Sequence, residues 1–417
     1  MPNATWARFL ETLLRLRALE SLRYREYRLL WSAQLFSGMG SWMDQVTRSW
    51  LIYELTDSAM QLGMVRGVQA IPYLLLSPLA GSAADRYSRR TQMLLAQGAN
   101  ALVYAVTAVL ILAGLIRPWH VYVTALLTAT CQVFQQPARS SMISDAVPRE
   151  YLTNAIGLNS LVFNVTRGIG PAVAGALIVV TGTGGAFGMQ AILLVIACAA
   201  TWPLTPVMHA SHVAGRGASF AHSILEGWKL SWQNETVRAG ILCVMLVSLF
   251  VIPFTTLLPV FARDLLAVGA TGQGLMLTAM GAGAFFSAAL VANAGHNMPR
   301  GAVMLVSGVL YGVSVIVFAA SPWFWLALAA MFAAGLFHVY SNALVQTVVQ
   351  SYTPPEFRGR TMALFSMNQF AITLGSMVVG TLTSIAGPRW AVALMGAGGA
   401  ISIVALHIAM PKARHIR

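Results

Sequence analysis

The charged residues that lie farthest inside segments otherwise apolar enough to cross a membrane are Asp44, Arg48, Arg66 and Arg167. A charge inside a lipid bilayer is costly, so a charge that is kept there indicates a functional role. A carboxylate such as Asp44 can bind and release a proton, whereas an arginine stays protonated and needs a carboxylate or an anionic ligand beside it. The chemistry that these residues offer is therefore proton exchange and anion binding.

Asp44 and Arg48 share one face of a predicted helix with Gln34 and Ser37, because these residues recur at intervals of three and four. A rise of about 1.5 Å per residue puts Asp44 and Arg66 at similar depths, about 10–14 Å below the outer surface, so the two could pair. A fixed bridge from Asp44 to Arg48 or Arg66 would only hold helices together. A desolvated Asp44 could instead carry a proton, and the sequence leaves both interpretations open.

Polar side chains also follow two other predicted helices. Gln132 and Gln136 lie in one helix and His338 and Asn342 in the other, and a shift of the chain by 206 residues sets the second pair on the first. We expect both pairs to face a central cavity. The intrinsic pKa of His338 suits proton transfer, although a histidine bonded to a backbone carbonyl is the commoner case. For Arg167 the expected partner is Asp44, a backbone carbonyl or an anionic group of a ligand.

Twelve predicted membrane helices position these residues. Of the 417 residues, 57% are hydrophobic and 9% are charged, and the mean hydropathy is +0.69. A soluble domain carries roughly 25% charged residues, and a membrane helix needs about 20 apolar residues. The predicted helices cover residues 29–53, 60–80, 92–115, 119–142, 154–180, 186–206, 238–261, 271–294, 302–320, 323–349, 361–386 and 389–410. The expected fold is an all-helical membrane protein made of two pseudo-symmetric six-helix bundles.

The longest polar interval lies at the midpoint of the chain and separates six predicted helices from six. The 206-residue shift also sets residues 148–151 on residues 354–357, which favours parallel halves with a site between them. The expected organisation is a cytoplasmic amphipathic segment (1–28), a six-helix bundle (29–206), a cytoplasmic central loop (207–237), a second six-helix bundle (238–410) and a cytoplasmic tail (411–417).

The net charge of +13 follows from the positions of the basic residues. They concentrate in the loops on one side, and membrane proteins keep such loops in the cytoplasm, so both termini are expected there. This distribution explains the charge without a nucleic-acid partner. No apolar core precedes the first predicted helix, so no cleaved signal peptide is expected. Cys131, Cys198 and Cys243 fall within predicted helices and are expected to pack there, with no metal and no cofactor.

A ten-residue turn, Gly81 to Arg90, separates the second and third predicted helices. Its glycine suits close helix approach, and its aspartate suits a helix N-terminus. We expect Asp85 to contact the start of the eleventh predicted helix, within residues 358–361, so that the turn acts as a conformational switch. The switch candidates are Gly81, Asp85, Arg86, Arg89 and Arg90.

A second motif lies in the fifth predicted helix, at Gly168, Gly170, Pro171 and Gly175. Small residues let two helices approach closely, and a proline removes one internal hydrogen bond and permits bending. Ordinary helix packing would explain the same residues.

These motifs resemble known ones. The pattern G-x-x-x-D-R-x-x-R-R at residues 81–90 resembles the signature loop of the major facilitator superfamily, and residues 168–175 resemble its antiporter-associated motif. Residues 55–59, 137–139 and 164–171 are similar to the branch that contains bacterial enterobactin and macrolide exporters. One departure is that Gln132, Gln135 and Gln136 occupy the helix in which many proton-driven exporters place a buried arginine.

The resemblance implies a monomeric secondary transporter of the bacterial cytoplasmic membrane that exports an amphiphilic siderophore, macrolide or drug-like molecule. Alternating access with protons as the coupling ion would drive it, in contact with membrane lipid. An uptake or lipid transporter of the same fold fits the same residues. A membrane enzyme is disfavoured because Asp44 is the single carboxylate in a predicted helix, and no phosphate-binding G-x-x-x-x-G-K-S/T motif is present. A channel is disfavoured because the second half lacks the aspartate of the turn.

Overall fold

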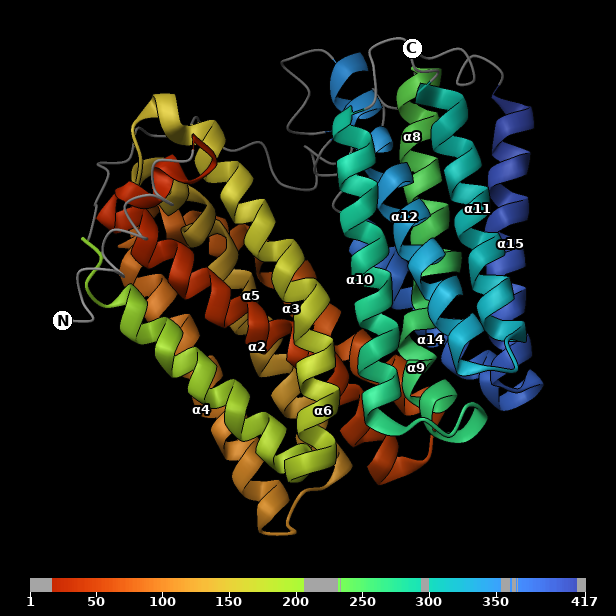
Figure 1. Ribbon diagram of the computed structural model, residues 1–417, viewed down its shortest axis with the longest axis horizontal. Coiled ribbons are helices and arrows are strands. Elements are labelled where there is room, and N and C mark those ends of the chain that lie inside the picture. Colours follow the sequence, from red (N-terminus) through yellow and green to blue (C-terminus); the bar gives the residue numbers. More distant parts are fainter. Residues whose placement is uncertain are drawn as a thin grey trace, which may run out of the picture. The chain divides into compact units, whose positions relative to one another are not determined.

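The computed structural model describes residues 17–205, 232, 234–293, 300–353, 361, 365 and 367–410, and this part of the chain is helical without strands (Figure 1). The first elements are η1 (Arg17–Arg23), α2 (Arg25–Thr56), α3 (Ala59–Arg86), α4 (Arg89–Leu112), α5 (Pro118–Asp145), η2 (Arg149–Tyr151) and α6 (Leu152–Thr201). They are followed by α8 (Glu235–Leu246), η3 (Val247–Val251), η4 (Ile252–Leu257), α9 (Leu258–Val260) and η5 (Phe261–Leu265). The last are α10 (Gly269–Asn293), α11 (Arg300–Ala320), α12 (Phe324–Tyr352), α14 (Asn368–Ala386) and α15 (Pro388–Ala409).

Several helix ends have a local cause in the sequence. Ser88 caps α4, since its side chain accepts a hydrogen bond from the Thr91 amide at 3.4 Å. Pro118 opens α5, where its missing N–H costs nothing. Gly387 takes a positive φ of 79° and separates α14 from α15. A side chain with a Cβ would be strained in that conformation.

The predicted helices 154–180 and 186–206 meet without a loop in α6. Gly182 alone leaves the helical conformation there, with φ 72° and ψ 177°, so two helices join at a kink. The predicted helix 238–261 is less regular than expected. It passes from α8 through the π-helical η3 into the 3-10 turns of η4, which include Pro253. A proline cannot donate the hydrogen bond that a regular helix needs at that position.

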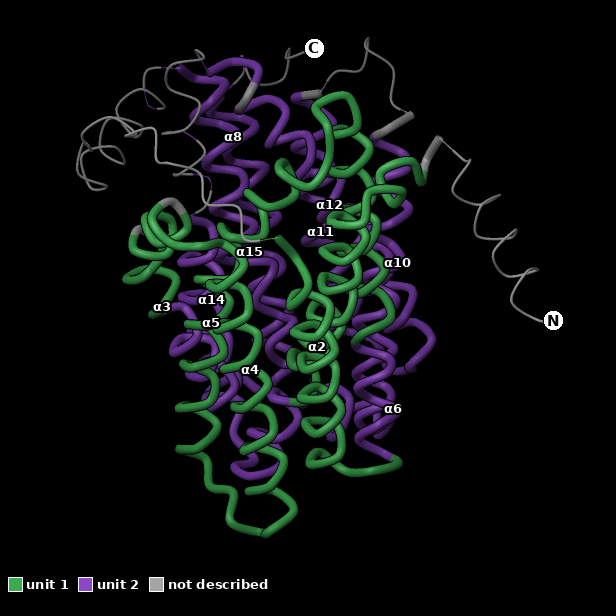
Figure 2. Tube along the Cα trace, turned by 90° about the vertical axis from the view of Figure 1, so that its left-hand side faces the viewer, with its two compact units in different colours: residues 1–47, 71–170, 180–212 green, residues 48–70, 171–179, 213–417 purple. Residues whose placement is uncertain are grey.

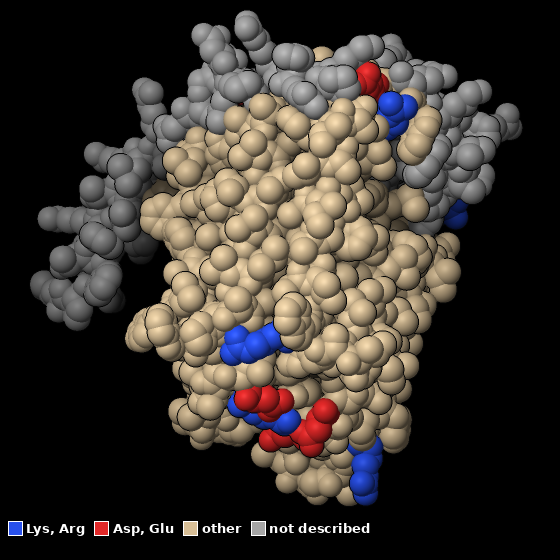
Figure 3. Space-filling view, turned by 90° about the vertical axis from the view of Figure 1, so that its right-hand side faces the viewer, with Lys and Arg blue, Asp and Glu red and all other residues tan. Residues whose placement is uncertain are grey.

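Among the described residues, eight helical stretches are long and apolar enough to cross a membrane. They do not include α2, α3 or α5, whose polar side chains lower their hydropathy. On the face drawn in Figure 3, the described charged side chains gather toward the two ends and leave a broad uncharged region between them.

The chain divides into two compact units (Figure 2). Unit 1 takes its described residues from 1–47, 71–170 and 180–212, and unit 2 takes them from 48–70, 171–179 and 213–417. The unit boundaries therefore fall inside α2, α3 and α6. Residues 48–70 and 171–179 pack with unit 2, although the helices that contain them otherwise belong to unit 1.

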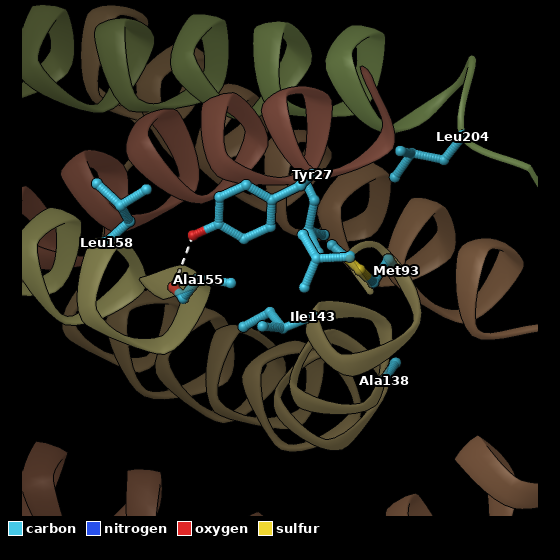
Figure 4. Packing of buried hydrophobic residues seen from close by; sticks show 9 residues of the cluster. Tyr27, Met93, Ala138, Ile143, Ala155, Leu158 and Leu204 are labelled. Carbon is cyan, nitrogen blue, oxygen red and sulfur yellow. Dashed lines mark hydrogen bonds between the residues drawn. The ribbon is translucent and has the colours of Figure 1, made fainter. Parts of the chain in front are cut away.

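The core of unit 1 gathers around Tyr27 of α2, which is 1% exposed. Its hydroxyl donates to the Ala155 carbonyl oxygen of α6 at 2.7 Å, and Met93 and Ile143 pack beside it (Figure 4). A buried phenol needs such a partner, so this bond aligns α2 with the start of α6.

The core of unit 2 contains buried aromatic rings from three segments. Phe254 lies against Phe318 with ring centroids 5.5 Å apart, and Phe261 lies against the same ring at 4.7 Å. The irregular segment 247–265 is thereby held against α11.

Candidate functional site

The basic turn after α3 is tied down by ion pairs and hydrogen bonds within unit 1. Arg89, at the start of α4, donates to the Asp145 carboxylate at the end of α5, and the two side chains are 18% and 21% exposed. Arg90 donates through Nε to the Trp202 carbonyl oxygen at 3.0 Å, and its guanidinium lies 5.5 Å from the centre of the Trp202 ring. Two of the predicted switch residues thus connect α4 to the ends of α5 and α6.

The turn itself is shorter than the sequence analysis expected. Residues 81–86 continue α3, and Tyr87 and Ser88 alone separate it from α4. A Cβ added to Gly81 would meet no atom of the described residues within 4 Å, and the helix start that it is expected to approach is mostly outside them, so the predicted close approach stays a prediction. Arg86 is exposed. The Asp85 side chain and residues 354–360 lie outside the described residues, so the contact predicted for Asp85 stays a prediction.

Charge reversal should test the Arg89–Asp145 pair. We expect Arg89→Asp and Asp145→Arg each to lower the free energy of unfolding by about 1–2 kcal/mol, because each places like charges together in a partly buried pair. The double variant should recover about 1 kcal/mol or more, since coupled neighbours are not additive. Denaturant unfolding of the purified chain measures all four proteins. Arg86→Asp, at an exposed arginine of the same turn, is the control, and strict additivity would contradict the pairing.

Asp44 and Arg48 are both buried in α2, at 5% and 2% exposure. Gln34 and Ser37 on the same face are buried at 4% and 3%. Arg66 in α3 is half-buried, and Asp44, Arg48 and Arg66 all engage other residues of the protein. The charged face expected from spacing therefore lies inside the protein.

Arg167 has an aromatic neighbour that the sequence analysis did not assign to it. Its guanidinium carbon lies 5.7 Å from the centre of the Trp42 ring, which suits a cation–π interaction. The Trp42 ring packs edge-on against Phe163 with centroids 5.6 Å apart. Arg167 is half-buried and makes further interactions. Trp42 therefore joins Arg167 of α6 to α2 within unit 1.

The two predicted glutamines of α5 join a polar cluster with α3. The Tyr73 hydroxyl donates to Gln132 Oε1 at 3.1 Å. One turn further along α5, Arg139 Nη2 donates to Gln136 Oε1 at 2.5 Å. We call Tyr73, Gln132, Gln136 and Arg139 the α3–α5 polar cluster. Tyr73 could not be assigned to it from the sequence, because nothing in the spacing of α3 shows which residue faces α5.

His338 lies against a neighbouring helix of its own unit. Its ring stacks on Tyr311 of α11 with centroids 5.1 Å apart and planes 29° apart. Tyr311 is fully buried, whereas His338 and Asn342 are half-buried on α12. Ring packing against α11 therefore occupies one face of His338.

The residues of the glycine motif of α6, Gly168, Gly170, Pro171 and Gly175, have different surroundings. A Cβ on Gly170 would lie 2.8 Å from the Trp42 Cβ, and one on Gly175 would lie 2.6 Å from the Ala270 carbonyl oxygen of α10. A Cβ on Gly274 of α10 would in turn overlap the backbone of Pro171. A Cβ on Gly168 would meet no described atom within 4 Å. Residues 171–175 therefore cross α10 backbone to backbone within unit 2, and Gly168 takes no part in that crossing.

A second polar cluster in unit 2 was missed by the sequence analysis. Arg263 donates through Nε to Asp264 Oδ1 at 2.9 Å, and its guanidinium also pairs with Asp57. Tyr53 donates to Asp264, and Arg263 lies 4.2 Å from the centre of the Tyr53 ring. We call these four residues the Tyr53–Arg263 cluster. Asp57 and Arg263 are 206 residues apart in sequence, so local spacing could not reveal the pair.

The described residues offer no metal site. Among them, no group of three or more histidine, cysteine, aspartate or glutamate side chains could hold a metal ion. The three cysteines are free thiols within helices.

The described residues form apolar helices of membrane-spanning length that enclose charged and polar side chains, as expected of a polytopic membrane protein. Residues 17–416 match the family model described as transmembrane secretion effector, a family of the major facilitator superfamily, and the chain belongs to that family. It is a transporter and not an enzyme. The resemblance to the major facilitator superfamily is thereby confirmed.

Named relatives cover most of the chain. The staphyloferrin A transporter of Staphylococcus aureus is 24% identical over 86% of this chain and 89% of that protein. The multidrug efflux pump Tap of Mycolicibacterium fortuitum is 26% identical over the same shares. Macrolide efflux protein A of Streptococcus pyogenes is 22% identical over 85% of this chain and 89% of that protein.

A solved transporter shares the fold. The nucleoside transporter NupG superposes with a TM-score of 0.73 at 17% identity and covers 93% of this chain and 99% of its own. At that identity the likeness concerns the fold alone.

Proposed function

We propose that the chain exports an amphiphilic small molecule across the bacterial cytoplasmic membrane in exchange for protons. The named relatives include a siderophore transporter and efflux proteins for drugs and macrolides, which supports an amphiphilic substrate. The two halves, residues 29–206 and 238–410, would each supply six helices, with both termini, the 1–28 segment, the 207–237 loop and the 411–417 tail in the cytoplasm. The transporter would act as a monomer in membrane lipid, without a nucleic-acid partner.

The packing of two helix segments supports the proposal of alternating access. Residues 48–70 and 171–179 pack with unit 2 through the Tyr53–Arg263 cluster and through backbone crossings at Gly175 and Gly274. The helices that contain these segments otherwise pack in unit 1. Contacts confined to one end of a helix can break and re-form together while the rest of the helix keeps its packing. The Asp57–Arg263 ion pair of this cluster is partly exposed, with the side chains at 74% and 33%, so breaking that pair costs little.

Transport by the purified chain in proteoliposomes tests the direction and the coupling. With the cytoplasmic face outward and an acidic lumen, we expect erythromycin to accumulate inside several-fold above its level in protein-free liposomes under the same gradient, which trap this basic amine passively. A proton that leaves the lumen releases free energy, about 1.4 kcal/mol per pH unit, that can drive one substrate inward. A protonophore should abolish the accumulation. Accumulation that requires an alkaline lumen would instead show symport, and accumulation without any gradient would contradict secondary transport of this kind.

A further inference from the structure

Arg139 is a half-buried guanidinium without an acidic partner among the described residues. It lies in α5, and the hydrogen bond that it donates there goes to the neutral side chain of Gln136, at 2.5 Å. Asp145, the carboxylate at the end of the same helix, is paired with Arg89. An arginine cannot lose its proton in a protein, so removal from water without a counter-ion is unfavourable.

Arg139 belongs to a partly exposed polar stripe along α5 in unit 1. Residues 132, 136 and 139 are spaced by four and three and therefore share one face of α5. Tyr73 of α3 joins this face, because its hydroxyl donates to Gln132 at 3.1 Å. Arg139 lies six residues before the end of the helix, about 9 Å along its axis. The stripe therefore continues inward from Arg139 toward the middle of α5.

Several N–H groups of the α3–α5 polar cluster do not take part in its internal hydrogen bonds. Gln132 and Gln136 both accept through Oε1, from Tyr73 and from Arg139. Within the described part of the chain, their Nε2 groups have no acceptor. The planar guanidinium of Arg139 carries further N–H groups that can donate hydrogen bonds. Tyr73 is 37% exposed and Gln136 is exposed, so a solute can reach these groups.

We propose that the α3–α5 polar cluster binds the anionic group, a carboxylate or another oxyanion, of an amphiphilic solute. Two oxygens of such a group match the parallel N–H groups of one guanidinium, and the amide donors of the glutamines complete the shell. The inference rests on the proposed function, since it assigns a charge to the transported molecule. The headgroup of an anionic lipid offers the same chemistry.

Fluorescence titration of the full chain in nanodiscs tests the proposal with a matched pair of probes. Dansylglycine carries one carboxylate, and its methyl ester is the same amphiphile without the charge. In phosphatidylcholine nanodiscs we expect the wild type to bind dansylglycine about tenfold more tightly than the ester, as one charged hydrogen-bonded contact provides. Arg139→Gln should remove that preference and leave ester binding unchanged. Arg139→Lys should keep part of the preference for dansylglycine, because a lysine ammonium retains the charge but lacks the two parallel N–H groups of a guanidinium.

Arg117→Gln is the matched control. Arg117 is an exposed arginine at the opposite end of α5, so its loss changes the net charge equally and should leave both affinities unchanged. Nanodiscs that contain phosphatidylglycerol identify the source of the anion. Dansylglycine binding that weakens in them more for the wild type than for Arg139→Gln shows that a lipid headgroup competes for the cluster, because repulsion by the anionic membrane affects both proteins equally. An equal change in both proteins shows selection for a soluble amphiphile.

A wild-type chain that binds dansylglycine no more tightly than its ester, or binds neither, overturns the proposal. Equal loss of both probes in Arg139→Gln overturns it as well, because that result shows a packing role. If Arg139→Gln fails to fold and Asp85→Asn restores folding in the double variant, the partner of Arg139 is that aspartate and no anion site exists. Proton-driven transport of a neutral compound by Arg139→Gln would leave the proposed function intact while the anion preference is lost.

Discussion

Asp44→Asn is expected to abolish accumulation of substrate against its gradient and to preserve downhill exchange. Asp44 is a 5% exposed carboxylate in α2, one helical turn before Arg48, which is 2% exposed. Asparagine has the shape of a protonated aspartate but cannot release a proton, so the carrier would be held in one protonation state. Gradient-driven accumulation should fall to the level of empty liposomes, and counterflow of labelled substrate should stay within about threefold of wild type, a change of less than 1 kcal/mol in the barrier.

Thermal unfolding separates this coupling role from a structural one. If Asp44 only neutralises a buried arginine, its loss leaves that charge uncompensated and destabilises the fold by about 3–5 kcal/mol. Glu150→Gln, at an exposed carboxylate of η2, is the control and should change neither measurement. Accumulation retained by Asp44→Asn would return Asp44 to a structural role and direct attention to His338, whose ring already packs on Tyr311.

Helix positions could largely be predicted because their signals are local. Long apolar runs mark where helices lie, and residues such as Ser88, Pro118 and Gly387 mark their ends through capping, a missing donor or a positive φ. The irregular segment 247–265 could not be predicted in the same way. Its apolar side chains suit a continuous helix, and its π and 3-10 turns depend on Pro253 and on packing against α11.

The contacts between helices could be predicted less well from the sequence. Spacing shows that Gln132 and Gln136 share a face, but it does not show that Tyr73 meets it. The Trp42 ring lies beside the Arg167 guanidinium, and nothing in the spacing of either helix pairs these two residues. The missing information in each case is which neighbour lies opposite. A single sequence does not contain it, because many apolar helix faces pack about equally well.

The backbone crossing of α10 and α12 should be the least tolerant part of unit 2. A Cβ on Gly335 of α12 would overlap the Met280 carbonyl oxygen and lie 2.7 Å from its carbon. A Cβ on Gly283 of α10 would overlap the Phe332 carbonyl oxygen and lie 2.9 Å from the Leu336 amide nitrogen. The atoms that would collide belong to helix backbones, which no side-chain rotation can move aside. At this crossing, the backbone of each helix therefore packs directly against a glycine of the other.

Gly335→Ala is expected to lower the free energy of unfolding by about 3 kcal/mol, the upper range for an overpacked core, and Gly335→Val to prevent accumulation of folded protein. Gly98→Ala is the matched control, since a Cβ there meets no described atom within 4 Å and alanine favours the helix by about 1 kcal/mol. Size-exclusion profiles and thermal unfolding of the purified variants measure both effects. Gly283→Ala should match Gly335→Ala, because the two glycines sit on opposite sides of one crossing. If alanine at either position behaves like alanine at Gly98, the helices can separate by about the thickness of a methyl group at no cost. In that case the close backbone approach is not what holds α10 against α12.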